Sequence, residues 1–134
     1  MALHVELVSP EEQVFSAEAE MVIARSVDGD IAFQTGHVPF IGVLDTNRLK
    51  VLLPDGGEQL IAVHRGFVEV SHDHVTILSD VAELAGDIDV ARARAALEQA
   101  EAALSADGDD VAAIAAKQRA ETRLYVAGEL ASGT

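Results

Sequence analysis

Three arginines and one aspartate in the last third of this chain are the residues best suited to bind a ligand. Arg119 and Arg123 are four residues apart and share one helix face, where two like charges are slightly destabilising unless an anion binds them. Asp89 and Arg92 stand at the start of another predicted helix. Arginine guanidinium groups grip phosphates through charge-assisted hydrogen bonds. The four residues therefore predict a phosphate or nucleotide site, with a basic stripe neutralised by water or by nearby glutamates as the alternative.

Histidines offer a second kind of chemistry. His72 and His74 could place two imidazoles on one side of a strand end, and His64 could approach them to complete a zinc site. The pair lies in a predicted hairpin turn, so solvated turn residues are the simpler interpretation. Asp28 and Asp30 flank a glycine and are most simply turn formers. With no nucleophile–base pair and no nucleotide-loop or metalloprotease motif, the sequence predicts a protein that is not an enzyme by itself.

The candidate phosphate ligands belong to an alanine-rich segment. Residues 90–127 hold fourteen alanines, one glycine and no proline, a composition typical of helix. Apolar residues at three- and four-residue steps predict helices over about 88–104 and 110–127, capped by Asp87 and Asp110. A short polar break joins them, which predicts an antiparallel helix hairpin over residues 87–134. Because its packing face is mostly alanine, we expect only a few kcal/mol to hold the hairpin in place, so a partner or ligand could move it.

Residues 1–86 follow a different pattern, with period-two alternation of apolar and polar residues. They contain all three prolines and seven of the ten glycines. Pro54-Asp55-Gly56-Gly57 is the strongest turn signal, and Asp28-Gly29 marks a hairpin. Eight to ten short, mainly antiparallel strands predict a β-sandwich or flattened barrel. The expected core consists of the inward residues of each alternation: Val5, Leu7, Met21, Ile23, Leu49, Val51, Ile61, Val63, Phe67, Val75 and Ile77.

Charge and composition limit the function further. The net charge of −14 argues against a nucleic-acid binder. Residues 1–86 hold fourteen acids and four bases, whereas the two predicted helices hold three acids and five bases, so the hairpin is the basic part of an acidic protein. There is no cysteine, no secretory signal and no apolar run of about 18 residues, which predicts a soluble protein.

Several segments together resemble the epsilon subunit of bacterial F-type ATP synthases. They run through residues 3–127 in the family's order and spacing, and each alone is a weak signal. The matching segments are Gly29–Phe40 with its Gly-His-x-Pro core, Gly66–Val70, Val75–Asp80, Ile88–Ala93 (Ile-Asp-x-x-Arg-Ala) and Arg123-Leu124.

The resemblance implies an N-terminal β-sandwich (1–86), a C-terminal hairpin (87–134) and a place in the central stalk of the ATP synthase. It implies attachment to the gamma subunit and the c-ring, and thus a peripheral position on the cytoplasmic side of the cell membrane. It also implies that the hairpin can rise toward the catalytic alpha/beta head and restrain ATP hydrolysis. By residue match, Asp30 lies in the loop facing the c-ring and His37 on the gamma side.

ATP-binding members of the family hold nucleotide at the positions of Asp89, Arg92, Arg119 and Arg123. Gln99 departs from their pattern, because those members have an arginine there, and one phosphate-gripping charge is therefore missing. No cofactor is required, and ATP is the expected regulatory ligand if the site forms. The alternative function is a free-standing sandwich ligand-binding module that uses the hairpin as a dimerisation arm.

Overall fold

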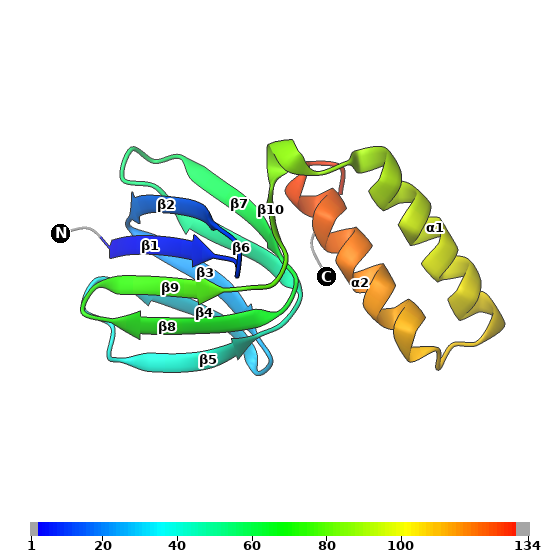
Figure 1. Cartoon of the computed structure of the whole chain (residues 1–134), viewed down its shortest axis with the longest axis horizontal. Helices are drawn as coiled ribbons and strands as arrows, with labels where there is room; N and C mark the ends of the chain where they lie inside the picture. Colours follow the sequence, from blue (N-terminus) through cyan, green and yellow to red (C-terminus); the bar gives the residue numbers. More distant parts are fainter. Residues whose placement is uncertain (1–2, 131–134) are drawn as a thin grey trace.

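The computed structural model describes residues 3–130 and contains a ten-stranded β-structure followed by two helices (Figure 1). The expected fold class, a β-sandwich of short strands followed by a helix hairpin, is confirmed. The strands are β1 (Leu3–Val8), β2 (Gln13–Ala19), β3 (Met21–Ser26), β4 (Gly29–Gln34), β5 (Phe40–Leu44), β6 (Asn47–Leu52), β7 (Glu58–Val63), β8 (Gly66–Ser71), β9 (His74–Leu78) and β10 (Ala82–Leu84). A 3-10 turn, η1 (Ala85–Asp87), leads to α1 (Val90–Ala106) and α2 (Val111–Val126).

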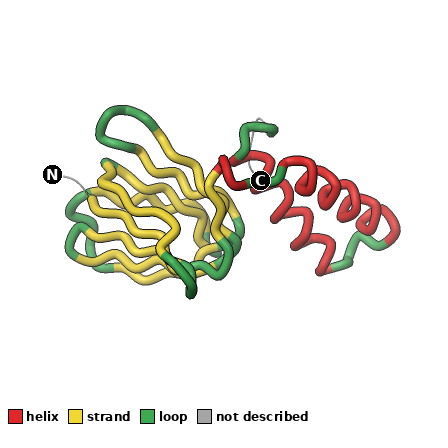
Figure 2. The backbone as a smooth tube through the Cα atoms, turned by 45° about the horizontal axis from the view of Figure 1, so that its top comes forward, coloured by secondary structure: helices red, strands yellow, loops and turns green. Residues whose placement is uncertain are grey.

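The strands form one sheet that folds over into two facing layers (Figures 1 and 2). Their order is β10-β7-β6-β3-β5-β8-β9-β1-β2, with β4 paired to the free edge of β3. The fold-over lies between β3 and β5, which share the single residue pair Ser26–Leu44. Among the strands of residues 3–130, only β1 and β9 pair in parallel. The helices lie beyond one end of the sandwich, next to the β6–β7 side.

The core between the layers is apolar and fully buried. Its largest side chains are Phe33, Leu3, Leu7, Leu49, Ile61 and Ile77. Eight of the eleven expected core residues are buried there, but Met21, Ile23 and Phe67 are not. In β3 the inward residues are Val22 and Ala24, because a break at Glu20 divides β2 from β3 and resets the alternation.

Phe67 is 54 % exposed, since β8 turns Val68 and Val70 inward and leaves Phe67 and Glu69 on the outer face. Glu69 lies on the same face of β8 as Phe67. This face points outward because the charged Glu69 side chain would otherwise enter the core.

Aspartates cap both helices. Asp110 accepts a hydrogen bond from the Ala113 amide, as predicted. At α1 the capping residue is Asp89, which accepts from the Arg92 amide at 3.0 Å, and not the predicted Asp87. Asp87 lies in η1 instead, because the chain makes this extra turn before the helix begins.

The two helices pack against each other mainly through small residues. The buried positions include Ala93 and Ala100 of α1 and Ala113 and Ala120 of α2. No helix within residues 3–130 is long and apolar enough to cross a membrane.

Candidate functional site

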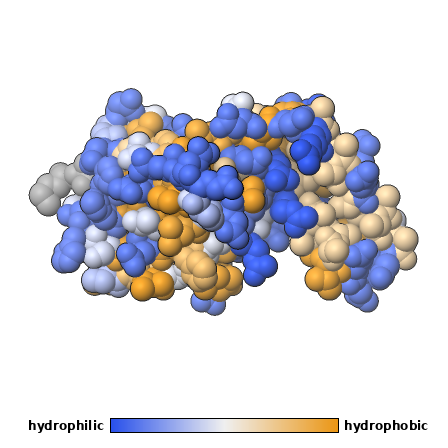
Figure 3. Space-filling model, in the orientation of Figure 1, coloured by the Kyte–Doolittle hydropathy of each residue, from blue (hydrophilic) through white to orange (hydrophobic). Residues whose placement is uncertain are grey.

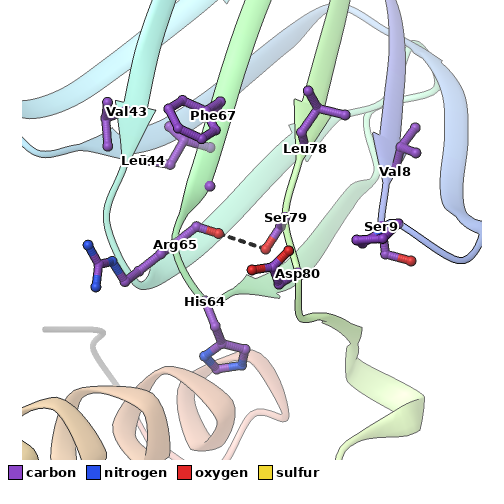
Figure 4. Close-up of a pocket in the computed structure, with 12 residues that line it drawn as sticks. Val8, Ser9, Val43, Leu44, His64, Arg65, Phe67, Leu78, Ser79 and Asp80 are labelled. Atoms are coloured by element: carbon purple, nitrogen blue, oxygen red, sulfur yellow. Dashed lines mark hydrogen bonds between the residues drawn. The ribbon is translucent and has the colours of Figure 1, made fainter.

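The hairpin and the sandwich meet at a shared carboxylate. Glu83 of β10 accepts a hydrogen bond from Arg123 Nε of α2 at 2.7 Å, and its Oε1 also lies 2.8 Å from Nε2 of His64, which follows β7. The His64 side chain is only 4 % exposed. Figure 4 shows this ring pointing toward the helices. One side chain from the hairpin and one from the sandwich therefore meet on Glu83, three residues before Gly86.

The surrounding donors strongly favour the ionised form of Glu83. The hydrogen bond from His64, followed by the bond and charge of Arg123, lowers the pKa of Glu83 to about 2 against the opposing effect of burial. The carboxylate is therefore charged at neutral pH and can only accept hydrogen bonds.

A second polar contact joins the helices to the sandwich. Gln118 Nε2 of α2 donates to the Thr46 carbonyl oxygen at 2.9 Å and lies 3.2 Å from an oxygen of Asp45. The interface also contains a small apolar cluster of Ala62, Ile88 and Val126, separate from the sandwich core. This docking interface is small and partly polar.

The predicted phosphate ligands are engaged in different ways. Asp89 caps α1, and Arg123 is bound to Glu83. Arg92 and Arg119 are exposed. Because α1 and α2 are antiparallel, the start of α1 lies beside the end of α2, so Arg92 and Arg123 are at the same end of the hairpin. The nucleotide site remains a prediction.

Asp30 lies in the edge strand β4 and is fixed by two arginines. Arg25 Nε donates to one carboxylate oxygen at 2.6 Å, and Arg48 Nη2 lies 3.3 Å from the other. These contacts, with Arg25 first, lower the pKa of Asp30 below its usual value. The side chain remains 45 % exposed. Asp30 is thus a rigidly held charge that a partner can reach; its proposed c-ring contact is not tested by the fold.

His37 lies in the loop between β4 and β5. Its ring packs edge-on against Phe33, with centroids 5.1 Å apart, and Nδ1 lies 2.7 Å from the carbonyl oxygen of Val38. It stands at the opposite end of β4 from Asp30. This strand has six residues, and each residue of a strand advances the chain by roughly 3.3 Å. Partners at the two positions would therefore contact different ends of the sandwich.

The histidines of the zinc alternative are not brought together. His64 precedes β8, whereas His72 and His74 follow it, so they lie at opposite ends of that strand. Within the described part of the chain, no group of three or more histidine or acidic side chains is placed to hold a metal ion.

An apolar row crosses the outer face of β5, β8, β9 and β1. Cross-strand pairing places Val43 beside Phe67, Phe67 beside Leu78 and Leu78 beside Val8. We call these four residues the outer row. It borders a hollow of about 520 Å³ whose walls also include Pro10, Arg65 and Asp80 (Figure 4). Hydrophobic atoms gather on this face of the sandwich in Figure 3.

The outer row continues toward the His37 loop. Ile41, two residues before Val43 on the same face of β5, is 72 % exposed, and Val38 beyond it is 70 % exposed. Contiguous exposed apolar surface of this kind marks an interaction site. This surface was not predicted from the sequence because Phe67 was assigned to the core; Glu69, which lies on the same face of β8 as Phe67, was the signal that could have revealed it.

Glu83 and His64 were likewise not predicted as a pair from the sequence. They are nineteen residues apart and meet only because β10 pairs with β7. No local pattern contains that information.

The fold and site together define a β-sandwich protein with a helical appendage and an exposed apolar face, the features of a subunit built for assembly. Residues 2–85 match the family described as ATP synthase, Delta/Epsilon chain, beta-sandwich domain. The chain belongs to this family, as its sequence resemblance predicted.

Relatives named ATP synthase epsilon chain support the assignment. The one from Streptomyces griseus is 44 % identical over 99 residues, covering 74 % of this chain and 80 % of the relative. The one from Thermobifida fusca is 48 % identical over 102 residues, covering 74 % of each chain. The expectation that the chain is not an enzyme by itself is confirmed by these relatives, because the epsilon chain is a non-catalytic subunit.

Solved structures share the fold. A chain of the Euglena gracilis mitochondrial ATP synthase, from a structure of its OSCP, F1 and c-ring, matches 96 % of this chain and 78 % of its own length with a TM-score of 0.71 at 21 % identity. A chain from the central stalk and c-ring of the Tetrahymena thermophila mitochondrial enzyme matches 69 % of each chain with a TM-score of 0.52 at 17 % identity. At these identities the likeness shows the fold alone.

Proposed function

We propose that this chain is a central-stalk subunit of a proton-translocating F-type ATP synthase. It attaches to the gamma subunit and the c-ring, and its C-terminal hairpin restrains ATP hydrolysis by contacting the alpha/beta head. Through that complex it is peripheral to the cytoplasmic side of the membrane. The observation that carries the proposal is the outer row, since a subunit that turns with a rotor must bind firmly to it.

The outer row fits a protein partner such as gamma. Phe67 and Leu78 are 54 % and 48 % exposed in the isolated chain, so burying the exposed part of each contributes about half of the 1.5–3 kcal/mol that full burial of such a side chain gives. The surface extends along β5 to Val38, next to the predicted gamma contact His37. The predicted c-ring contact, Asp30, stands at the other end of β4, so the two partners could bind at the same time.

The docked hairpin fits a regulatory role. Its contacts with the sandwich are few: the Glu83 carboxylate, the Gln118 amide and one small apolar cluster. Such an interface can be outweighed by a competing partner. The basic residues of the hairpin suit an acidic docking target on the head, and exposed Arg92 and Arg119 remain candidates for a regulatory ATP molecule.

Co-purification with gamma tests the proposal. We expect Phe67→Ser to weaken retention of the chain on immobilised gamma subunit at mild salt at least tenfold, with the chain still folded because Phe67 lies outside the core. Val111→Ser is the matched control, since Val111 is 77 % exposed but lies on the hairpin. Failure of the unmodified chain to bind gamma, or equal loss in both variants, would overturn this role. A stable homodimer in light scattering would instead favour the free-standing module.

Deletion of residues 87–134 tests the regulatory part. The sandwich retains its own core without the helices, so the shortened subunit should still assemble. We expect faster ATP hydrolysis by the assembled enzyme. Unchanged hydrolysis would show that this hairpin is not inhibitory.

A further inference from the structure

Glu83 occupies an unusual position, because among the described residues it is the one sandwich carboxylate that forms an ion pair with a side chain of the hairpin. It lies on β10, the last strand before the hairpin, and Arg123 approaches it from a helix forty residues further along the chain. The Glu83 and Arg123 side chains are 24 % and 28 % exposed. The ion pair is therefore partly shielded from water, and such pairs contribute more than exposed ones.

His64 holds the carboxylate in place from the sandwich side. Since ionised Glu83 can only accept, Nε2 of His64 donates to it, and the ring's other nitrogen, Nδ1, is buried without a hydrogen-bond partner in the described part of the chain. The bond to Glu83 is thus the ring's single polar contact. Rotating the carboxylate away would leave both ring nitrogens unsatisfied in a nearly closed site, which costs free energy. His64 is a positioning residue that aims Glu83 at the helix.

The rest of the docking interface is too small to make this contact redundant. The apolar cluster contains Ala62, Ile88 and Val126 with a few half-buried neighbours, and the Gln118 amide adds its contacts to the Thr46 carbonyl oxygen and the Asp45 carboxylate. Ile88 is itself part of the connection that leads to α1. Only a short stretch near the end of α2 therefore gives apolar contact from the hairpin side.

We propose that His64, Glu83 and Arg123 form a latch that holds the hairpin against the sandwich. Glu83 is the fixed acceptor on the sandwich, and Arg123 is the donor that moves away with the hairpin. The hairpin opens when Arg123 separates from Glu83, and His64 keeps the carboxylate oriented for its return. This latch deepens the regulatory role proposed above and rests on it for its biological effect, but the docking equilibrium itself is a property of the isolated chain.

The latch can be measured directly by the distance between the two parts. The chain contains no cysteine, so Glu69→Cys on β8 and Glu98→Cys on α1, both exposed, provide two unique sites for spin labels. Pulsed electron resonance on the isolated full-length chain then reports the docked and open populations. We expect Glu83→Gln and Arg123→Gln each to raise the open-to-docked ratio about tenfold, the effect of losing one charge-assisted contact.

A double-mutant cycle separates the latch from general charge effects. Because both substitutions break the same pair, the Glu83→Gln/Arg123→Gln double variant should open no further than either single variant. The matched control pairs Glu58→Gln with Arg94→Gln, an exposed acid on β7 and an exposed base on α1 whose ion-pair partner, Glu129, follows α2. These controls should leave the ratio unchanged.

The outcomes are distinct. Unchanged distances in Arg123→Gln, or full additivity in the double variant, would overturn the latch. Arg123 lies outside the sandwich, so this variant still tests the latch if Glu83→Gln fails to fold. An open hairpin with unchanged hydrolysis in the assembled enzyme would overturn the regulatory function and leave the latch standing. If the hairpin stays closed in both variants while deleting residues 87–134 raises hydrolysis, the latch would be overturned and the regulatory function would stand.

Discussion

Arg123 of α2 donates its Nε–H to Oε1 of Glu83 at 2.7 Å, across the boundary between the sandwich and the hairpin. The same oxygen is 2.8 Å from Nε2 of His64. This relationship gives the hairpin's position a dependence on charge, and it connects β10, the last strand of the sandwich, to α2, the last helix of the chain.

Acid should release the hairpin. The pKa of Glu83 is lowered from an ordinary value of 4.5 to about 2 when His64 and Arg123 contact it. A lowered carboxyl pKa contributes stability that is fully present above pH 4.5 and is lost as the pH falls toward 2. We therefore expect the open-to-docked ratio of the spin-labelled chain to rise across this window.

Glu83→Gln serves as the control for that titration, because its side chain cannot gain a proton in this range. The variant should start more open and show a flatter pH dependence as the pH falls from 4.5 toward about 2, the range between the ordinary pKa of Glu83 and its lowered pKa in the docked state. Equal slopes in the variant and the unmodified chain would show that other carboxyl groups drive the opening.

Arg65 and Gly66 should respond in opposite ways to substitution. Arg65 adopts φ 65°, a left-handed conformation that costs an ordinary residue about 1–2 kcal/mol. Its side chain is exposed, and its carbonyl oxygen, which accepts from Ser79 Oγ, is kept in any variant. After allowing for the greater freedom of glycine in the unfolded chain, Arg65→Gly should stabilise the protein by roughly 0.5–1 kcal/mol.

Gly66→Ala provides the contrast, and thermal unfolding measures both variants. A Cβ at position 66 would lie 2.1 Å from the backbone oxygen of Leu78 in the paired strand β9. We expect a loss of roughly 3 kcal/mol or a failure to fold, since backbone must shift to relieve the clash. Destabilisation by Arg65→Gly would contradict the strain argument at that position.

His4 should make the sandwich less stable as the pH rises. Its Nδ1 lies 3.0 Å from Glu18 and its Nε2 lies 3.2 Å from Glu6, so carboxylates face both ring nitrogens. The hydrogen bond to Glu18, above all, raises the pKa of His4 above 6.5. A raised histidine pKa gives stability that is fully present below pH 6.5 and is lost as the pH rises through the higher folded value.

Urea unfolding at a series of pH values that starts below 6.5 and extends upward tests the role of His4, because its raised pKa places the loss of stability above that value. Glu18→Gln should flatten the decline because it removes the main cause of the raised pKa. His72→Gln is the matched control, since His72 is exposed in the β8–β9 turn, and it should leave the pH dependence unchanged. A decline of the same slope in Glu18→Gln would refute the assignment.

The features of this structure that depend on neighbouring residues could be predicted from the sequence. Turn dipeptides, alternation and the change from glycine and proline to alanine predicted the sandwich and the hairpin, because each depends on neighbouring residues. The prediction of the core was wrong at Met21, Ile23 and Phe67. Both faces of their strands carry apolar residues there, so the face that is buried depends on the opposing layer of the sandwich. Arg25 and Glu69, each on the exposed face of its strand, were the available corrections.

The contacts of the site were beyond local reasoning for a different reason. Arg123 was correctly singled out as a charge in need of a partner, but Glu83 lies forty residues earlier and His64 nineteen residues before that. Those separations are closed by the β7–β10 pairing and by the docking of α2. Neither leaves a periodic signal in the sequence.

Gln99→Arg should create or tighten ATP binding. Gln99 is exposed on α1, seven residues and about two turns after Arg92, so both side chains lie on one face of the helix. An arginine there would add a second guanidinium group beside Arg92 to bind phosphate oxygens. Its charge-assisted hydrogen bonds should raise the affinity for ATP about tenfold. Calorimetric titration of the isolated chain with ATP measures the effect.

Glu101→Gln is the matched control for that titration, because it changes the net charge by the same amount from a position about 200° around the helix from residue 99. We expect it to leave ATP affinity nearly unchanged. Arg92→Gln in the Gln99→Arg background should remove the gain, since the two arginines are expected to hold the same phosphates. An equal gain in Glu101→Gln would mean that ATP responds only to overall charge, and the residues Asp89, Arg92, Arg119 and Arg123 would then not form a nucleotide site.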